Sequence, residues 1–262
     1  MSNFLQKMLL ILVLVFPGAA SAEYQAPTKG KILLVASSPA TADNGWPVGF
    51  WMAELSHPYD ELTYAGYEVV IASTSGGEIE LDAYSDPRHE SGYSVNDIVS
   101  LGFLESPSTA PKLENTISIE DVNHEEYVAI VIAGGVAPMF TFRDNETLQQ
   151  LISDFYVSGR PTAALCHGVT SLLDVKLPDG SYLVEGKSVT AFSVVEDKEV
   201  EASINGQFFD WYVEEALVER GANYTQGGLW ADYAIQDGNL ITGQQQYSGR
   251  TVGRLVAALL DE

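Results

Sequence analysis

The chain has 262 residues, one cysteine, four histidines and a formal net charge of −23 at pH 7. The acidic residues are spread along the chain, which argues against nucleic acid and anionic membrane surfaces as partners because both would repel it. A single cysteine also excludes an internal disulfide framework.

The first residues have the pattern of a secretory signal peptide. Lys7 gives a short basic region, and residues 8–16 form an apolar run too short to span a bilayer. Pro17 follows this run, and a small-x-small cleavage motif ends at Ala22. We therefore expect residues 1–22 to be removed and the mature protein to be secreted or periplasmic, without a membrane anchor.

The first half of the mature chain alternates short apolar runs with helical patterns. In chain order, the pattern predicts a strand at 31–36, a polar loop at 37–45, a helix at 58–65 stopped by Gly66, a strand at 67–72, a loop-rich stretch at 73–123 with a short helix near 95–101, and a strand at 127–132. A loop of that length is unusual unless it covers a site, so we expect it to shield one.

The second half continues the same alternation. Its predicted elements are a helix capped by Asp144 and running to Val157, a strand before Cys166, a hairpin at 178–180, a helix within 208–219, strands at 232–235 and 240–242, and a terminal helix at 248–260. Apolar strands separated by helices predict one α/β domain over residues 23–262, with a mainly parallel sheet covered on both faces. Ligands of such folds bind beyond the carboxyl ends of the strands.

Cys166 lies between the buried strand and the start of a helix, in the run Leu165-Cys166-His167-Gly168. This is the pattern of a nucleophile elbow, where a helix end favours the thiolate. A small buried hydrophobic residue is the structural alternative. His167 could act as a base or could contribute only its backbone N–H to an oxyanion hole.

Glu54 is the second candidate, because it is a carboxyl group among large apolar residues. If it is buried, its pKa should be raised, which suits proton exchange with a thiolate or a substrate. The alternative is a solvated position on a turn before a helix that begins at Pro58.

Gly134 and Gly135 end the third strand and could present a backbone N–H to an oxyanion, opposite the amide of His167. His57, His89 and His124 lack ligand spacing, so neither a metal nor another cofactor is expected, although His89-Glu90 could bind a metal.

Together these positions resemble the ThiJ/PfpI superfamily, whose fold is shared with class I glutamine amidotransferases. The resemblance rests on the Lys31 strand, Glu54-Leu-Ser-His57-Pro58, Ile132-Ala-Gly134-Gly135, Ala164-Leu-Cys166-His167-Gly168, Val189-Thr-Ala-Phe192 and the segment from Asp232 to Gly243. It implies a flavodoxin-like three-layer sandwich with a covering insertion. The Glu-x-x-His-Pro and late Asp-Gly-x-Leu-x-Thr-Gly elements look most like the branch of heat-shock chaperones and glutathione-independent glyoxalases.

That resemblance implies Cys166 as the nucleophile, His167 as the triad histidine and Glu54 as the carboxyl partner. The acidic triad member would be Glu196 or Asp197, which follow the 189–192 strand. The implied activity is that of a glyoxalase III-like hydro-lyase, in which the thiolate attacks methylglyoxal and the product is lactate.

Several alternatives stay open at this point. A glutaminase is not one of them, because it needs a histidine far downstream of the cysteine and none follows His167. A non-catalytic stress chaperone and a thiol redox sensor belong to the same superfamily. Members of the superfamily are commonly dimers, so a homodimer is an alternative to a monomer. The chain departs from the family pattern at Val136, where a histidine is common, at Val169, where proline is usual, and after Gly243, where Gln244-Gln-Gln-Tyr replaces the frequent Asn-Pro.

Overall fold

The computed structural model describes residues 28–42, 45–204 and 206–262. The predicted signal peptide and its cleavage site lie outside these residues. Within the described part, no helix combines the length and the apolar character needed to cross a membrane.

A seven-stranded sheet forms the centre of the molecule, with the strand order β10-β11-β7-β6-β1-β4-β5. Its strands are β1 (Lys31–Ala36), β4 (Glu68–Ser73), β5 (Ile117–Ser118), β6 (Tyr127–Ile132), β7 (Thr162–Leu165), β10 (Ala234–Asp237) and β11 (Leu240–Gly243). All neighbouring strands are parallel except β10 and β11. Two short ladders pair β2 (Ala40–Thr41) with β3 (Pro47–Val48) and β8 (Ser188–Val189) with β9 (Asn223–Tyr224).

Both faces of the sheet are buried, as the apolar strands predict. In β1, Ile32 and Leu34 pack with apolar residues of α1 (Met52–Tyr64) and α7 (Gly249–Leu260), while Leu33 and Val35 pack with α4 (Glu146–Val157) on the other face. This alternation follows from the two-residue side-chain period of a strand. The predicted three-layer α/β fold is therefore confirmed.

Helix α1 begins at Met52, six residues before the predicted start at Pro58. We expected the proline at the first position, where its missing N–H costs nothing. Instead Met52 and Leu55, which precede the proline, are fully buried, and the residues from Met52 onward extend the helix by more than a turn. Pro58 lies inside the helix, and a Cβ on Gly249 of α7 would lie only 3.3 Å from its Cδ, so the two helices pack closely there. This places Glu54 in the first turn.

Other boundaries differ less. Asn145, not Asp144, caps α4, because its Oδ1 accepts a hydrogen bond from the Leu148 N–H at 2.9 Å. Within the 73–123 insertion the predicted short helix is α2 (Ile98–Glu105), capped by Asp97. A short helix, α3 (Pro138–Thr141), follows β6. The turn predicted at 178–180 is closed by an antiparallel bridge between Lys176 and Tyr182.

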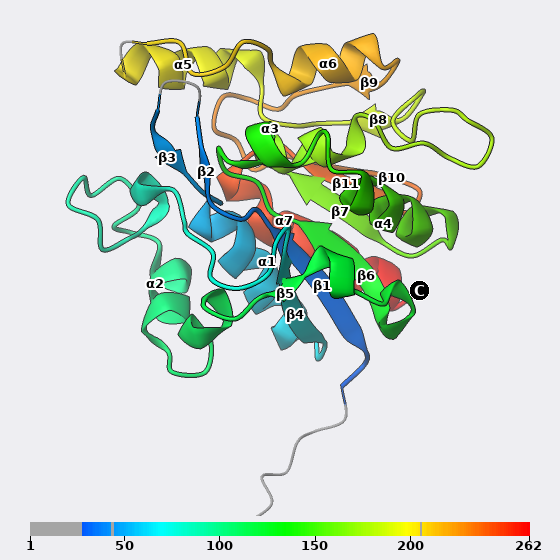
Figure 1. The fold of residues 1–262 in the computed structure, drawn as a ribbon, viewed down its shortest axis with the longest axis horizontal. Coiled ribbons are helices and arrows are strands. Elements are labelled where there is room, and N and C mark those ends of the chain that lie inside the picture. The colour runs from blue at the N-terminus through cyan, green and yellow to red at the C-terminus, as the bar shows by residue number, and fades with distance from the viewer. Residues whose placement is uncertain (1–27, 43–44, 205) are drawn as a thin grey trace, which may run out of the picture.

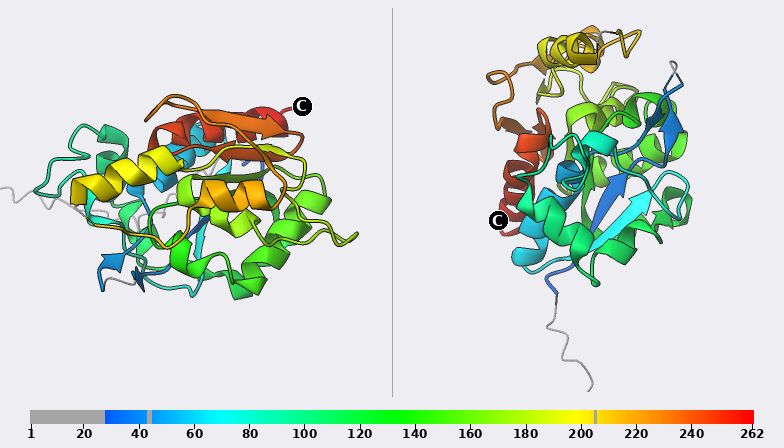
Figure 2. Two further views of the ribbon diagram at one scale, coloured as in Figure 1. Left: turned by 90° about the horizontal axis from the view of Figure 1, so that it is seen from above. Right: turned by 90° about the vertical axis from the view of Figure 1, so that its left-hand side faces the viewer.

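Helices α5 (Val194–Ile204) and α6 (Val213–Glu219) contact each other beyond the main sheet, along the top of the view in Figure 1. In the right-hand view of Figure 2, α5 of this pair lies at one end of the molecule. The sequence analysis predicted a helix over α6 but none over α5. The buried residues of α5 are the acids Glu196 and Asp197, so the apolar periodicity that indicates a helix is missing.

Candidate active site

Cys166 is buried and has a φ of 57°, a left-handed conformation that non-glycine residues rarely adopt. It follows β7 directly and opens a 3₁₀ segment, Cys166–Leu172. The strand therefore ends in a strained turn that lifts the thiol out of the sheet, which is the elbow predicted from the sequence. The N–H groups of Gly135 and His167 are directed at the sulfur and lower its pKa.

Glu54 is fully buried beside Cys166. Its Oε2 accepts a hydrogen bond from the Gly134 N–H at 2.9 Å, and its carboxyl group also interacts with the Cys166 thiol. Burial raises the pKa of this carboxyl from 4.5 to about 8. The alternative of a solvated Glu54 is therefore wrong, because α1 begins early and turns this side chain inward.

Glu54 and Cys166 form a coupled pair of acids. Burial raises the pKa of the Cys166 thiol above its ordinary value, and an ionised Glu54 raises it further. We expected the helix end alone to favour a thiolate, but burial is the larger effect and opposes it. Two adjacent buried anions repel strongly, so the pair retains at least one proton. A protonated Glu54 removes the repulsion, so that burial alone then opposes the charge on sulfur that the amides of Gly135 and His167 stabilise.

His167 connects the thiol to a second carboxylate. Its Nδ1 lies 3.7 Å from the Cys166 Sγ, and its Nε2 lies 2.9 Å from Oδ1 of Asp197. His167 and Asp197 are both buried. Burial raises the pKa of Asp197, and the nearby histidine opposes that change. Of the two acidic candidates in the sequence, Asp197 is therefore the one that contacts His167.

Glu196 has a different environment. Its Oε2 accepts from the backbone N–H and the hydroxyl of Ser193, and its Oε1 accepts from the Trp230 N–H and the Gln244 Nε2. It is fully buried and points away from His167 toward the 227–230 loop. The option of Glu196 as the triad acid is wrong, because its carboxylate is occupied by these four donors.

The two glycines after β6 have separate functions. The Gly134 N–H donates to Glu54, so its proposed place in an oxyanion hole is wrong; the amides of Gly135 and His167 face the sulfur instead. A Cβ on Gly134 would lie 2.5 Å from Glu54 Oε2 and 2.8 Å from the Cys166 Cβ. A glycine is needed at this position because the carboxyl and the thiol leave no room for a side chain.

A cavity of about 80 Å³ lies over Cys166. Its wall is mainly aromatic and draws on distant parts of the chain: Trp51, Glu54, Tyr93, Gly135, Val136, Cys166, His167, Phe192, Asp197, Val200, Phe208, Phe209, Trp230 and Gln246. The Phe192 ring lies 4.4 Å from the His167 ring, centroid to centroid. Val136, a departure from the family pattern, lines this cavity, whereas Val169 is buried in the core below the elbow. Tyr93 comes from the 73–123 insertion, which therefore covers the site as expected.

Asp82, also from the insertion, was missed by the sequence analysis. Its two carboxylate oxygens accept from the Gly49 and Val136 N–H groups, each at 2.8 Å, so it ties the segment before α1 to the loop after β6. Burial raises its pKa to about 7. An acid in an irregular loop gives no periodic signal, and only the fold brings it to this position.

The remaining histidines lie apart from the elbow. His57 contacts Asp97 at 2.9 Å, His89 contacts Ser91, and His124 contacts Arg160. Across the described ranges, no group of three or more His, Cys, Asp or Glu side chains could hold a metal ion.

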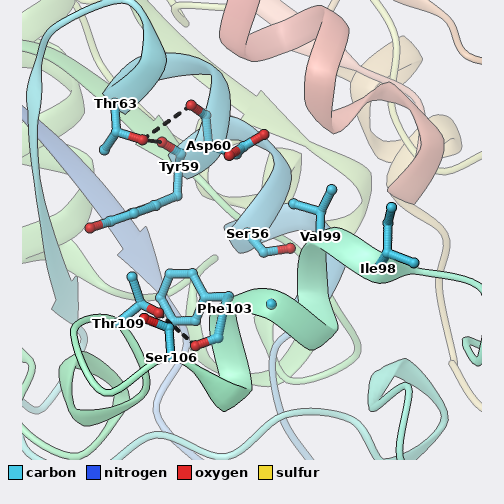
Figure 3. Close-up of a pocket in the computed structure, with 10 residues that line it drawn as sticks. Ser56, Tyr59, Asp60, Thr63, Ile98, Val99, Phe103, Ser106 and Thr109 are labelled. Carbon is cyan, nitrogen blue, oxygen red and sulfur yellow. Dashed lines mark hydrogen bonds between the residues drawn. The ribbon is translucent and has the colours of Figure 1, made fainter.

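A larger hollow of about 450 Å³ opens between α1 and α2, and Figure 3 shows its lining. Tyr59 of α1 and Phe103 of α2 face each other across it. It is lined by hydroxyl and apolar side chains with one carboxylate, Asp60, and contains neither the cysteine nor a histidine. The candidate active site is therefore the smaller cavity over Cys166.

Comparison with known proteins adds independent information. The profile of the DJ-1/PfpI family matches residues 48–257. A Schizosaccharomyces pombe protein named glutathione-independent glyoxalase hsp3101 is 30% identical over 248 residues, which cover 86% of this chain and 93% of that protein. The structure of Rapid Encystment Protein 24 KDa from Francisella tularensis has a TM-score of 0.79 at 31% identity, covering 88% of this chain and 99% of that one. Glyoxalase III from Candida albicans, at 22% identity, a TM-score of 0.71 and coverage of 88% and 97%, shares the fold.

Proposed function

The chain belongs to the DJ-1/PfpI family, and we propose that it is a glutathione-independent glyoxalase that converts methylglyoxal to lactate through a covalent adduct on Cys166. One observation carries the proposal: a buried cysteine with a strained backbone lies beside Glu54, a carboxyl whose pKa is raised to about 8, and beside a histidine held by Asp197. A relative with the same named activity, 30% identical over most of the chain, supports the reaction class.

The size and charge of the cavity favour a small neutral carbonyl. A volume of about 80 Å³ is well below the roughly 300–1,000 Å³ of pockets for drug-sized ligands. Asp197 lines the cavity, and the carboxylate of Glu196, which accepts from four donors, lies close behind it. These acidic groups oppose the entry of an anion, so a 2-oxoaldehyde suits the site better than a 2-oxoacid.

The first step forms the carbon–sulfur bond. The Cys166 thiolate attacks the aldehyde carbon, and the carbonyl electron pair moves to its oxygen. The N–H groups of Gly135 and His167 face this region and stabilise the developing alkoxide. The alkoxide then takes the proton of Glu54, whose pKa of about 8 leaves the carboxyl largely neutral at pH 7. The product is a hemithioacetal and an ionised Glu54.

The second step is an isomerisation. Glu54, now ionised, removes the proton from C1 and delivers it to C2 through an enediol, while the hydroxyl proton passes from the C1 oxygen to the C2 oxygen. The C1 carbon is oxidised and C2 is reduced, so no external oxidant is needed, and a lactoyl thioester results. His167, oriented by Asp197, removes a proton from the water that attacks this thioester. The carbon–sulfur bond breaks to release lactate and the Cys166 thiolate; of the two protons that this hydrolysis frees, one restores the neutral Glu54 and the other passes to the solvent.

The test is an assay of purified protein with methylglyoxal in the absence of glutathione, with lactate measured as the product. We expect turnover by the wild type and none by Cys166→Ala. Equal inactivity of both proteins across small 2-oxoaldehydes would exclude the glyoxalase. Suppression of client aggregation that survives Cys166→Ala would then favour the chaperone alternative.

We also propose that the protein acts outside the cytosol. The support is the basic, apolar and small-residue pattern of residues 1–22. N-terminal sequencing of the protein from an exported fraction should give Glu23 as the first residue, and a cytosolic, uncut chain would contradict the proposal.

A further inference from the structure

Helix α5 places one of its faces on the cavity over Cys166. Asp197 and Val200 line the cavity, and Glu201 lies one residue further on the same face, since positions three and four apart in a helix are neighbours. Asp197 contacts His167, whereas Glu201 makes none of the contacts with Cys166, His167 or Glu54 that define the reacting groups. Its carboxylate points instead into the segment that joins α5 to α6.

Glu201 holds this segment, residues 206–212, in its middle and at its end before α6. Oε1 accepts from the N–H groups of Phe208 and Phe209, at 2.9 and 3.4 Å, and Oε2 accepts from the Tyr212 hydroxyl at 2.9 Å. Burial and this carboxylate raise the pKa of Tyr212 to about 12, so the phenol stays protonated and remains a donor. A single side chain thus fixes the backbone of two residues and the end of the segment before α6.

The two phenylalanines fixed in this way form part of the cavity wall. The Phe209 ring lies 5.1 Å from the His167 ring, and Phe208 lies 5.2 Å from Phe209, between centroids. Both line the cavity of about 80 Å³. In a space this small, a shift of either ring changes which molecules reach the sulfur.

We propose that Glu201 is a specificity-determining positioning residue: by holding Phe208 and Phe209 against the cavity, it restricts Cys166 to small, slender molecules. The part of the inference that concerns the substrate rests on the proposed function, and it assigns the site to 2-oxoaldehydes with a methyl-sized substituent. The part that concerns access of molecules to the thiol does not depend on whether the protein turns over a substrate. Without the carboxylate, the two N–H groups turn to water for acceptors, the segment moves outward, and wider molecules enter.

The chain has one cysteine, so thiol alkylation reports on this cavity alone. We would measure the rate constants of N-methylmaleimide and N-phenylmaleimide with the full protein, because these reagents share their chemistry and differ in width. Glu201→Ala should raise the phenyl-to-methyl rate ratio by about tenfold, a change of about 1.4 kcal/mol in the relative barriers. Glu201→Gln, which keeps an oxygen acceptor for the amides, should stay within about twofold of the wild type.

Ser203→Ala is the matched control on the same helix, because this residue is exposed and its hydroxyl donates to the Val200 carbonyl of its own helix. It should leave the ratio unchanged. If Glu201→Ala does not fold, Glu201→Asp decides the question: its carboxylate is withdrawn by one methylene and should raise the ratio by a smaller factor. An unchanged ratio in a folded Glu201→Ala or Glu201→Asp protein, or an equal rise in Ser203→Ala, would overturn the inference.

The catalytic counterpart is the ratio of kcat/KM for phenylglyoxal and methylglyoxal, which Glu201→Ala should raise in favour of phenylglyoxal. A merely structural defect would lower both values in proportion. If the wild type turns over neither substrate, the proposed function fails. The ratio of maleimide rates then still tests whether Glu201 holds the two phenylalanines against the cavity. If methylglyoxal is consumed and neither ratio changes, the function stands and this inference fails.

Discussion

The Nε2 atom of His167 lies 2.9 Å from Oδ1 of Asp197, while the adjacent Glu196 turns toward Trp230 and Gln244. Successive residues of a helix point about 100° apart, so neighbouring acids on α5 cannot share one partner. The geometry gives the two carboxylates different tasks. Asp197 orients the histidine beside the thiol, and Glu196 fixes the loop that carries part of the cavity wall.

Replacing Asp197 should impair turnover more than folding. In Asp197→Asn the shape is kept, but the amide can donate a hydrogen bond to His167 Nε2 and thereby favour the wrong tautomer. We expect kcat with methylglyoxal to fall by about a hundredfold to ten-thousandfold, as in comparable triads. Steady-state kinetics and a denaturation curve measured on the same sample test this. A variant with wild-type kcat would remove Asp197 from the mechanism.

Replacing Glu196 should instead impair folding more than turnover. In Glu196→Gln one acceptor oxygen becomes an NH₂ group, and either orientation of the amide faces two existing donors. We expect a loss of about 2 kcal/mol in the free energy of unfolding, because buried donors lose their acceptor. Urea denaturation measures the loss. Unchanged stability with a large fall in kcat would show that Glu196 acts in the chemistry.

The buried Glu54 should make stability depend on pH. Its pKa is about 8 in the folded protein against 4.5 for an ordinary carboxyl, so the folded state holds a proton that the unfolded state loses above pH 4.5. This contribution is fully present below pH 4.5 and is lost as pH rises to about 8; its size is about 5 kcal/mol.

Glu54→Gln should therefore flatten the profile of unfolding free energy between pH 4.5 and 8 and should be the more stable protein at pH 8. Asp82→Asn is the matched comparison, since burial also raises the pKa of Asp82, to about 7. In Asp82→Asn, the pH range over which the profile of unfolding free energy is flattened should end about one pH unit lower than in Glu54→Gln. Parallel profiles for the wild type and Glu54→Gln would mean that Glu54 is ionised in the folded protein.

A methyl group at Gly134 should disrupt the site sterically. The added Cβ would lie 2.5 Å from Glu54 Oε2 and 2.7 Å from the Leu165 carbonyl oxygen, so Gly134→Ala should cost about 1–3 kcal/mol of stability and abolish turnover.

Gly102 of α2 is the control for this substitution, because a Cβ placed there would meet no heavy atom within 4 Å beyond the adjacent residues and the backbone of its own helix. Gly102→Ala should stabilise the protein by about 0.5–1 kcal/mol, since alanine favours a helix, and should leave activity intact. The two melting temperatures should shift in opposite directions. A Gly134→Ala protein with normal stability and activity would contradict the close packing of Glu54 and Cys166.

Local sequence was sufficient where an element is determined by its own residues. The runs at 31–36 and 127–132 are continuous and apolar, and the structure has strands with those same bounds. The elbow at Cys166 was also predictable, because a buried strand, a turn and a glycine are adjacent in the chain. Helix α5 was not, since its buried side chains are acidic and pair with partners far away in sequence.

The sequence by itself therefore determined the layered α/β fold, the position of the thiol and the short list of acids that could serve it. Only the tertiary structure decided which acid faces which partner. Glu54 meets Gly134 across 80 residues and Asp197 meets His167 across 30. Contacts of that kind depend on where separate helices begin and end relative to the sheet. The early start of α1 brings Glu54 to Gly134, and α5, which the sequence did not predict, brings Asp197 to His167. The physical reason is that a buried carboxyl gains its role from the donors packed around it, and the chain brings those donors together only when it folds.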